Sequence, residues 1–196
     1  MISSKITYRN ANIADISSIM KIEHASFSEV ICEDRKVFTE RIATFPDGFR
    51  VMECDGEIIG YICSELWERV HTFSKDLFTL GHSIKNRHKS YGREIYVSSM
   101  GLNPEYRSLG LGKTMFNEFV IHITEKFTDI DSIVLLVSEK WSKARKIYAS
   151  NGFKEIDILE EFFYYNVEKP YYEDGIIMRK ELKHIGNKDK SREDFI

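Results

Sequence analysis

A glycine-bearing turn between a strand and a helix constrains this chain more than any other segment. A strand-like run ends at Leu102-Asn103-Pro104, and Arg107-Ser108-Leu109-Gly110-Leu111-Gly112-Lys113 leads directly into a helix predicted over residues 113–127. The first turn of a helix presents unpaired N–H groups at the positive end of its macrodipole, and glycine lets the backbone approach an anion closely. The segment therefore predicts a phosphate-binding turn, to which Arg107 can add a bidentate donor.

Two familiar phosphate motifs are excluded at this turn. The dinucleotide fingerprint G-x-G-x-x-G needs a glycine at position 115, where Met115 stands. The triplet Gly112-Lys113-Thr114 is similar to the end of a P-loop, but that motif needs a glycine at position 107, where Arg107 stands. The pattern that remains is R-x-x-G-x-G.

Hydrophobic periodicity predicts alternating strands and helices along the rest of the chain. The clearest hairpin joins residues 49–54 to residues 57–67 through Asp55-Gly56, a two-residue turn that favours positive φ. The other strands are predicted at 5–9, 94–102, 133–137, 153–158 and 175–182, and the other helices at 14–27, 35–45 and 142–151. Residues 68–92 show no periodicity and indicate a long surface loop. The order β-α-α-β-β-β-α-β-α-β-β mixes hairpins with helical crossovers and predicts an α/β fold with a mixed sheet.

Length and charge indicate a single domain over residues 1–182, followed by a charged C-terminal tail over 183–196 that we expect to be flexible. The net charge of -3 gives no basic signature for nucleic acid, and no run is apolar enough to cross a membrane. The absence of a secretory-type start and of any C-x-x-C pair among the three cysteines favours a cytoplasmic location. None of the six histidines has the spacing of a metal site, so we expect no metal.

The pattern R-x-x-G-x-G resembles the coenzyme-A pyrophosphate signature of the Gcn5-related N-acetyltransferase (GNAT) superfamily. The hairpin at residues 55–61 and the segment 144–153, in which Tyr148 precedes Asn151-Gly152-Phe153, are similar to that superfamily as well. The resemblance covers nearly the whole chain. It implies a mixed, mostly antiparallel sheet, flanked by helices and splayed between the fourth and fifth strands after Leu102.

The resemblance also implies acetyl-CoA as the cosubstrate and an amine as the acceptor, which attacks the thioester directly in a ternary complex. It assigns the thioester arm to the strand before the turn, with a backbone N–H near Met100 polarising the acetyl carbonyl. Members of the superfamily often form dimers, so a homodimer is one assembly to test. The residues that the resemblance places against coenzyme A are Met100, Gly101, Leu102, Arg107, Ser108, Leu109, Gly110, Leu111, Gly112, Lys113, Ser138, Ala144 and Tyr148.

Tyr148 is the candidate general acid. By resemblance, its side chain lies near the thioester sulfur, and a phenol with a pKa of about 10 stays protonated at neutral pH. Such a phenol can donate its proton to the departing thiolate.

The general base is less defined by the sequence. Strict alternation along residues 94–102 predicts Glu94, Tyr96, Ser98 and Met100 on one face and Ile95, Val97 and Ser99 on the other. The chain also resembles arylalkylamine N-acetyltransferases, which carry two histidines on this strand, and the matching positions here are Tyr96 and Ser98. We therefore expect Glu94 or Glu65, acting through water, to be a substitute base.

The acceptor site is expected from two aromatic and acidic segments. Glu65 and Trp67 end one strand of the first hairpin, and Tyr164 and Tyr171 belong to the connection over residues 160–174. Ring faces and carboxylates suit a cation. One resemblance points to a small arylalkylamine-like amine and another to the N-terminal amine of a protein or peptide. A third possibility is a module that binds acyl-CoA but is catalytically silent.

Overall fold

The predicted strands form one twisted sheet in the computed structural model, which describes residues 5–165 and 169–182. The strand order is β1-β2-β3-β4-β5-β7-β6, and β4 with β5 is the parallel pair among antiparallel neighbours. The predicted α/β class with a mostly antiparallel sheet is confirmed. The strands are β1 (Ile6–Asn10), β2 (Phe49–Cys54), β3 (Glu57–Trp67), β4 (Glu94–Leu102), β5 (Ser132–Ser138), β6 (Lys154–Tyr165) and β7 (Tyr171–Glu181).

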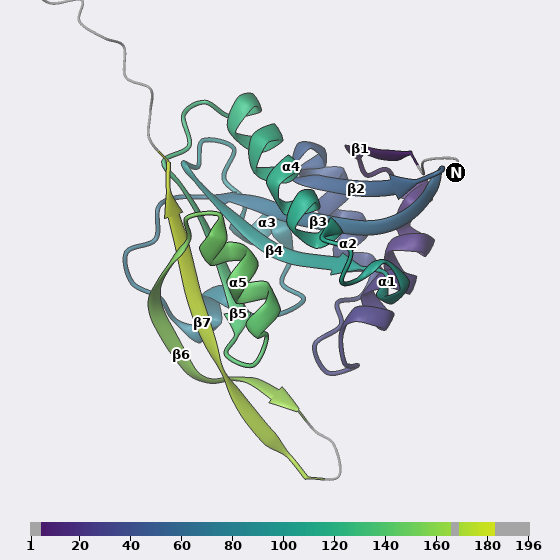
Figure 1. Ribbon diagram of the computed structural model, residues 1–196. Coiled ribbons are helices and arrows are strands. Elements are labelled where there is room, and N and C mark those ends of the chain that lie inside the picture. Colours follow the sequence, from purple (N-terminus) through teal and green to yellow (C-terminus); the bar gives the residue numbers. More distant parts are fainter. Residues whose placement is uncertain (1–4, 166–168, 183–196) are drawn as a thin grey trace, which may run out of the picture.

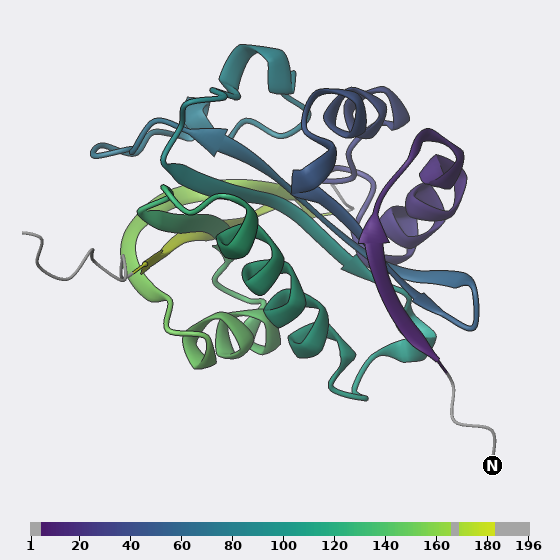
Figure 2. The ribbon, with the colours of Figure 1, turned by 90° about the horizontal axis from the view of Figure 1, so that it is seen from above.

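Helices cover both faces of this sheet (Figures 1 and 2). One face carries α4 and α5, and its core includes Phe116 and Phe119 packed on sheet residues such as Ile133. The opposite face carries α1 and α2, where Ile19 and Phe38 pack around Tyr61. The helices are α1 (Ile16–Ser26), α2 (Arg35–Thr44), α3 (Ile84–Arg87), α4 (Leu111–Lys126) and α5 (Ser142–Ser150).

The sheet opens between β4 and β5, earlier along β4 than predicted. The two strands pair from Glu94 with Ser132 to Val97 with Leu135, and the rest of β4 pairs with β3 alone. β5 pairs along its whole length with β7, which draws it away from β4. The expected splay is therefore confirmed, but it begins after Val97 and not after Leu102. Residues 98–102 consequently face a gap.

The strict alternation predicted for β4 is wrong. Cys63 of β3 pairs with Ser99, but the next residue, Ser64, pairs with Val97, so Ser98 is an extra residue in a β-bulge. A bulge reverses the facing of every later side chain. Met100 therefore shares the α4 face with Val97, whereas Ser99 turns to the α1 face and contacts Tyr61.

Two segments expected to be loops are more ordered than predicted. The connection over 160–174 is largely strand, because β6 runs to Tyr165 and β7 begins at Tyr171, forming the long hairpin at the lower edge of Figure 1. The surface segment 68–92 contains α3 and buries Phe78 and Ile84. Residues 166–168 and the predicted tail over 183–196 lie outside the described residues.

Candidate active site

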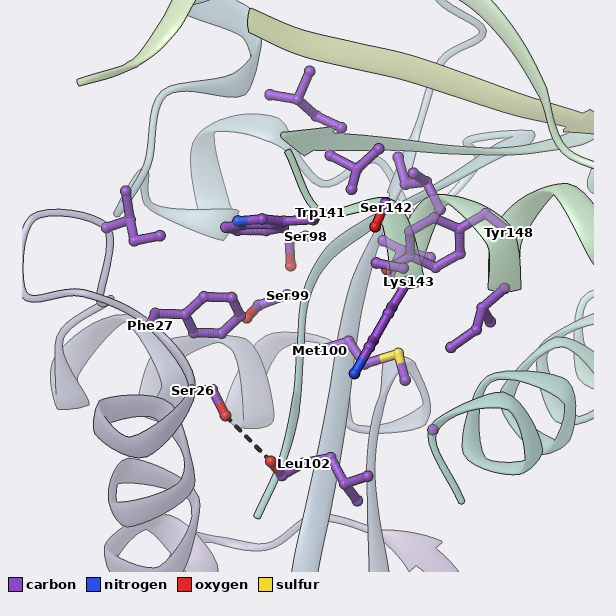
Figure 3. Close-up of a pocket in the computed structure, with 18 of the residues that line it drawn as sticks. Ser26, Phe27, Ser98, Ser99, Met100, Leu102, Trp141, Ser142, Lys143 and Tyr148 are labelled. Atoms are coloured by element: carbon purple, nitrogen blue, oxygen red, sulfur yellow. Dashed lines mark hydrogen bonds between the residues drawn. The ribbon is translucent and has the colours of Figure 1, made fainter. Parts of the chain in front are cut away.

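A cavity of about 880 Å³ occupies the gap where β4 and β5 separate. β4 contributes Ser98, Ser99 and Met100 to its wall, and Figure 3 shows these strand residues between Phe27 on one side and Tyr148 on the other. The divergence of two strands thus creates the site, and the helices on both faces of the sheet close it.

The glycine loop, residues 107–113, borders this cavity. Gly110 has a φ of 79° and forms the N-cap of α4, a left-handed conformation that favours glycine. α4 begins at Leu111, two residues earlier than predicted, so the free N–H groups of its first turn belong to the loop itself. Arg107 is anchored across the cavity rim, since its Nε donates to the Leu102 carbonyl at 3.1 Å and its Nη2 to Ser26 Oγ at 3.0 Å.

Most of the residues assigned to coenzyme A by resemblance line the cavity. They are Met100, Leu102, Arg107, Ser108, Gly110, Gly112, Lys113, Ala144 and Tyr148. Four others do not line it. Gly101 packs against the Tyr61 ring, Leu109 is 68% exposed, Leu111 joins an apolar cluster below the loop, and Ser138 donates its buried hydroxyl to Glu173.

Three lysines that sequence reasoning missed add positive charge beside the glycine loop. Lys140 precedes α5, and Lys143 and Lys146 lie on it, and all three line the cavity together with Lys113 of the loop. Residues three apart on a helix lie on the same side, so the spacing of Lys143 and Lys146 was a usable signal. With the α4 N-terminus, these ammonium groups make this part of the cavity suited to phosphates.

Tyr148 of α5 lies in the cavity wall with its ring packed against Phe116 at 5.0 Å and Phe153 at 6.1 Å between centroids. Burial raises the pKa of the Tyr148 hydroxyl to about 12, so the phenol is protonated at neutral pH. Among the described residues nothing accepts a hydrogen bond from this hydroxyl. Its proton is therefore free for a group bound in the cavity.

A second set of cavity residues is aromatic and was not predicted. This aromatic wall consists of the rings of Phe27, Trp141 and Phe163 with the aliphatic side chain of Ile31, and these residues come from three segments, the α1–α2 connection, the start of α5 and β6. The Trp141 ring lies 5.5 Å from Phe27 and 5.4 Å from Phe163 between centroids. Such a surface suits an apolar or aromatic group.

Two carboxyl groups, Glu23 and Glu33, line the cavity as well. Burial raises the pKa of Glu23 to about 7, although hydrogen bonds from the Tyr61 hydroxyl and the Glu33 N–H lower it. Glu33 forms a buried ion pair with Arg41. The charge of Glu33 is thus balanced within the protein, whereas Glu23 receives neutral hydrogen-bond donors.

Residues 16–153 match the model described as the Acetyltransferase (GNAT) family. The chain belongs to this family. An N-alpha-acetyltransferase of Sulfurisphaera tokodaii is 27% identical over 155 residues, which make up 79% of this chain and 84% of the relative. The chain is thus a GNAT acetyltransferase, as predicted.

Solved structures agree on the fold. The loading GNATL domain of CurA from Lyngbya majuscula superposes with a TM-score of 0.73 at 14% identity, over 90% of this chain and 98% of that domain. Naa50 of Arabidopsis thaliana, in complex with the bisubstrate analogue CoA-Ac-MVNAL, gives 0.66 at 17% identity, over 90% of this chain and 99% of the other. The GNAT fold binds acetyl-CoA.

The structure places both carboxylates predicted as the base outside the GNAT cavity. Glu94 is fully buried, where it pairs with Arg179 Nε at 2.8 Å and accepts from Ser132 Oγ at 2.6 Å. Glu65 is also fully buried, where it contacts His82 Nε2 at 2.6 Å and accepts from Trp67 Nε1 at 3.1 Å. Both carboxylates are held by internal partners, so we withdraw them as base candidates.

Tyr96 and Ser98 do line the cavity, but each already has a structural role. The Tyr96 ring stacks on Trp67 at 4.1 Å, and burial raises the pKa of its hydroxyl far above the usual value. The Ser98 hydroxyl donates to the Cys63 carbonyl at 3.3 Å. Neither group is a base at neutral pH.

The residues predicted to bind the acceptor are not cavity residues. Trp67 is buried behind Tyr96, and Glu65 is held in the internal network. Tyr164 and Tyr171 lie on the β6–β7 hairpin, where they are 41% and 47% exposed. The predicted acceptor residues thus lie outside the cavity, which is lined instead by the aromatic wall with Glu23 and Glu33.

Within residues 5–165 and 169–182, no group of three or more histidine, cysteine, aspartate or glutamate side chains is arranged to hold a metal ion. Over the same ranges, no helix has the length and apolar character needed to span a bilayer.

Proposed function

We propose that this GNAT enzyme transfers the acetyl group of acetyl-CoA to a primary amine by direct attack in a ternary complex. The observation that supports this proposal most strongly is one continuous cavity that joins the glycine loop, the Tyr148 hydroxyl and the Glu23 carboxyl. These three features supply an anion site, a proton donor and a site for a cation.

The glycine loop and its lysines are proposed to hold coenzyme A. The pyrophosphate would accept from the N–H groups at the start of α4, while Lys113, Lys143 and Lys146 neutralise phosphate charge. The pantetheine arm would pair with β4 beyond Val97, where β5 no longer competes for backbone hydrogen bonds. A free backbone N–H there can polarise the thioester carbonyl.

Tyr148 is proposed as the general acid. When the amine attacks, the C–S bond of the tetrahedral intermediate breaks and the sulfur leaves as a thiolate. The Tyr148 hydroxyl gives its proton to that sulfur, and the proton on the newly formed amide nitrogen restores the phenol through water.

The acceptor best supported by the cavity is a small primary amine with an apolar or aromatic substituent. The aromatic wall can cover the substituent, and the part of the cavity lined by Glu23 and Glu33 can receive the ammonium. A peptide N-terminal amine is the second candidate. It is favoured by the sequence similarity to the Sulfurisphaera N-alpha-acetyltransferase and by the fold shared with the Naa50 complex.

Mass spectrometry after incubation with acetyl-CoA would test the function. The acceptors would be arylalkylamines, aliphatic amines of matched length, and peptides with free or blocked N-termini. We expect arylalkylamine products to form fastest; faster acetylation of free peptide N-termini would establish the second candidate. Binding of coenzyme A in calorimetry without any acetylated product would show the silent module and refute the enzyme.

A further inference from the structure

A chain of hydrogen bonds leads from the cavity surface into the core on the α1 face. Ser99 of β4 is partly exposed in the cavity, next to Met100, and its Oγ lies 2.9 Å from the Tyr61 hydroxyl of β3. The Tyr61 hydroxyl in turn donates to the Glu23 carboxylate of α1. One polar path thus connects β4, β3 and α1, because the bulge at Ser98 turns Ser99 toward Tyr61.

The hydrogen count fixes the direction of this path. A tyrosine hydroxyl has one hydrogen, and that of Tyr61 is given to Glu23. Ser99 must therefore donate its own hydrogen to Tyr61. The lone pairs of Ser99 that remain are then available to accept an N–H from a cation in the cavity.

Building on the proposed function, we propose that Ser99, Tyr61 and Glu23 form the proton relay that deprotonates the acceptor ammonium. The N–H bond of the ammonium breaks and its proton moves to Ser99 Oγ. The Ser99 proton moves to Tyr61, and the Tyr61 proton moves to the Glu23 carboxylate. The neutral amine then attacks the acetyl carbonyl, and Glu23 releases one proton to solvent in each turnover.

The surroundings of Glu23 suit a base that works near neutral pH. Glu23 is 1% exposed as a residue, and its pKa of about 7 leaves about half of its carboxyl ionised at pH 7. Burial raises the pKa of Tyr61 well above 10, so the three transfers must be concerted and leave no tyrosinate. The charged or titratable groups that face Glu23 are Cys32 and Glu33 of the α1–α2 segment, Arg41 of α2, and Tyr61 and Cys63 of β3.

The other carboxyl in the cavity does not compete for this role. Both oxygens of Glu33 contact Arg41, and Oε1 also accepts from the Gly81 N–H at 3.0 Å. The Glu33 oxygens are thus occupied by donors within the protein. Glu33 is therefore assigned to the internal ion pair, and proton removal is assigned to the relay.

Three variants test the relay on the full-length chain. Glu23→Gln should lower kcat about 100-fold and remove the inflection near pH 7 from the kcat/KM profile, because the terminal acceptor is lost. Tyr61→Phe and Ser99→Ala should each lower kcat about 10-fold or more. Affinity for acetyl-CoA should stay close to that of the native chain.

Two variants outside the cavity are matched controls. Glu53→Gln removes a carboxylate of β2 that accepts from Arg9, and Tyr8→Phe removes a buried hydroxyl of β1. Both should keep the rate and the pH profile. The loss of kcat caused by Glu23→Gln should also be smaller with an amine fluorinated at carbon 2. The ammonium of that amine is more acidic and depends less on a base for its deprotonation.

Different results would refute the proposed relay and the proposed function. If the native chain acetylates no amine, the proposed function is wrong. If the native chain is active and Glu23→Gln keeps both its rate and the inflection near pH 7, the relay is wrong. An equal deficit of Glu23→Gln with the fluorinated and the parent amine would also overturn the relay.

Discussion

The glycine loop and the aromatic wall border the same cavity, but they are built in different ways. The loop consists of seven consecutive residues, and its anion site depends on backbone N–H groups and the φ of Gly110. The aromatic wall gathers Phe27, Ile31, Trp141 and Phe163 from three segments that lie far apart in the sequence, and its properties depend on side chains. The difference teaches that the proposed donor site of this chain is encoded locally and its proposed acceptor site through the tertiary fold.

The largest effect is expected at the loop. Gly110→Asp should weaken coenzyme-A binding about 1000-fold or more in calorimetry, because a side chain and a negative charge would occupy the anion site at positive φ. Gly56→Asp is the matched control, since Gly56 has a φ of 88° in the β2–β3 turn. Equal binding by both variants would remove the loop from the donor site.

Tyr148→Phe tests a side chain of the cavity that belongs neither to the glycine loop nor to the aromatic wall. The ring that packs on Phe116 stays, and only the donor hydroxyl is lost. We expect kcat to fall about 100-fold with little change in the affinity for either substrate. Stopped-flow measurement of coenzyme-A release would check this, and an unchanged rate would remove Tyr148 from its acid role.

Sequence reasoning succeeded where the signal is local. The glycine loop, the Asp55-Gly56 hairpin and Tyr148 in the cavity wall all depend on short segments. Glu94 was misassigned because its partner Arg179 lies 85 residues further along the chain. The bulge at Ser98 arises from pairing with β3, and no periodicity within residues 94–102 could reveal it.

The raised pKa of Glu23 can be tested through the pH dependence of the free energy of unfolding. A carboxyl whose folded pKa is raised stabilises the fold when protonated, and this contribution is lost as the pH rises through about 7. Relative to that of the native chain, the free energy of unfolding of Glu23→Gln should therefore rise by on the order of 2 kcal/mol between pH 4.5 and pH 8. Urea denaturation at several pH values measures this gain, and a difference independent of pH would contradict it.

The smallest effect is expected from the lysines beside the loop. Lys143→Ala combined with Lys146→Ala should weaken coenzyme-A binding about 10-fold at low salt and less at high salt, because exposed charges are screened. Lys36→Ala combined with Lys154→Ala removes the same charge away from the cavity and should leave binding unchanged. Equal losses in both pairs would show a general charge effect.

A crystal structure with a bisubstrate analogue, coenzyme A joined through an acetyl linker to an arylalkylamine, tests the central claim most directly. We predict that the pyrophosphate lies on the N–H groups of residues 110–112, the amine nitrogen beside Ser99, and the ring against Phe27 and Phe163. An amine moiety bound instead on the β6–β7 hairpin near Tyr164 and Tyr171 would contradict the account.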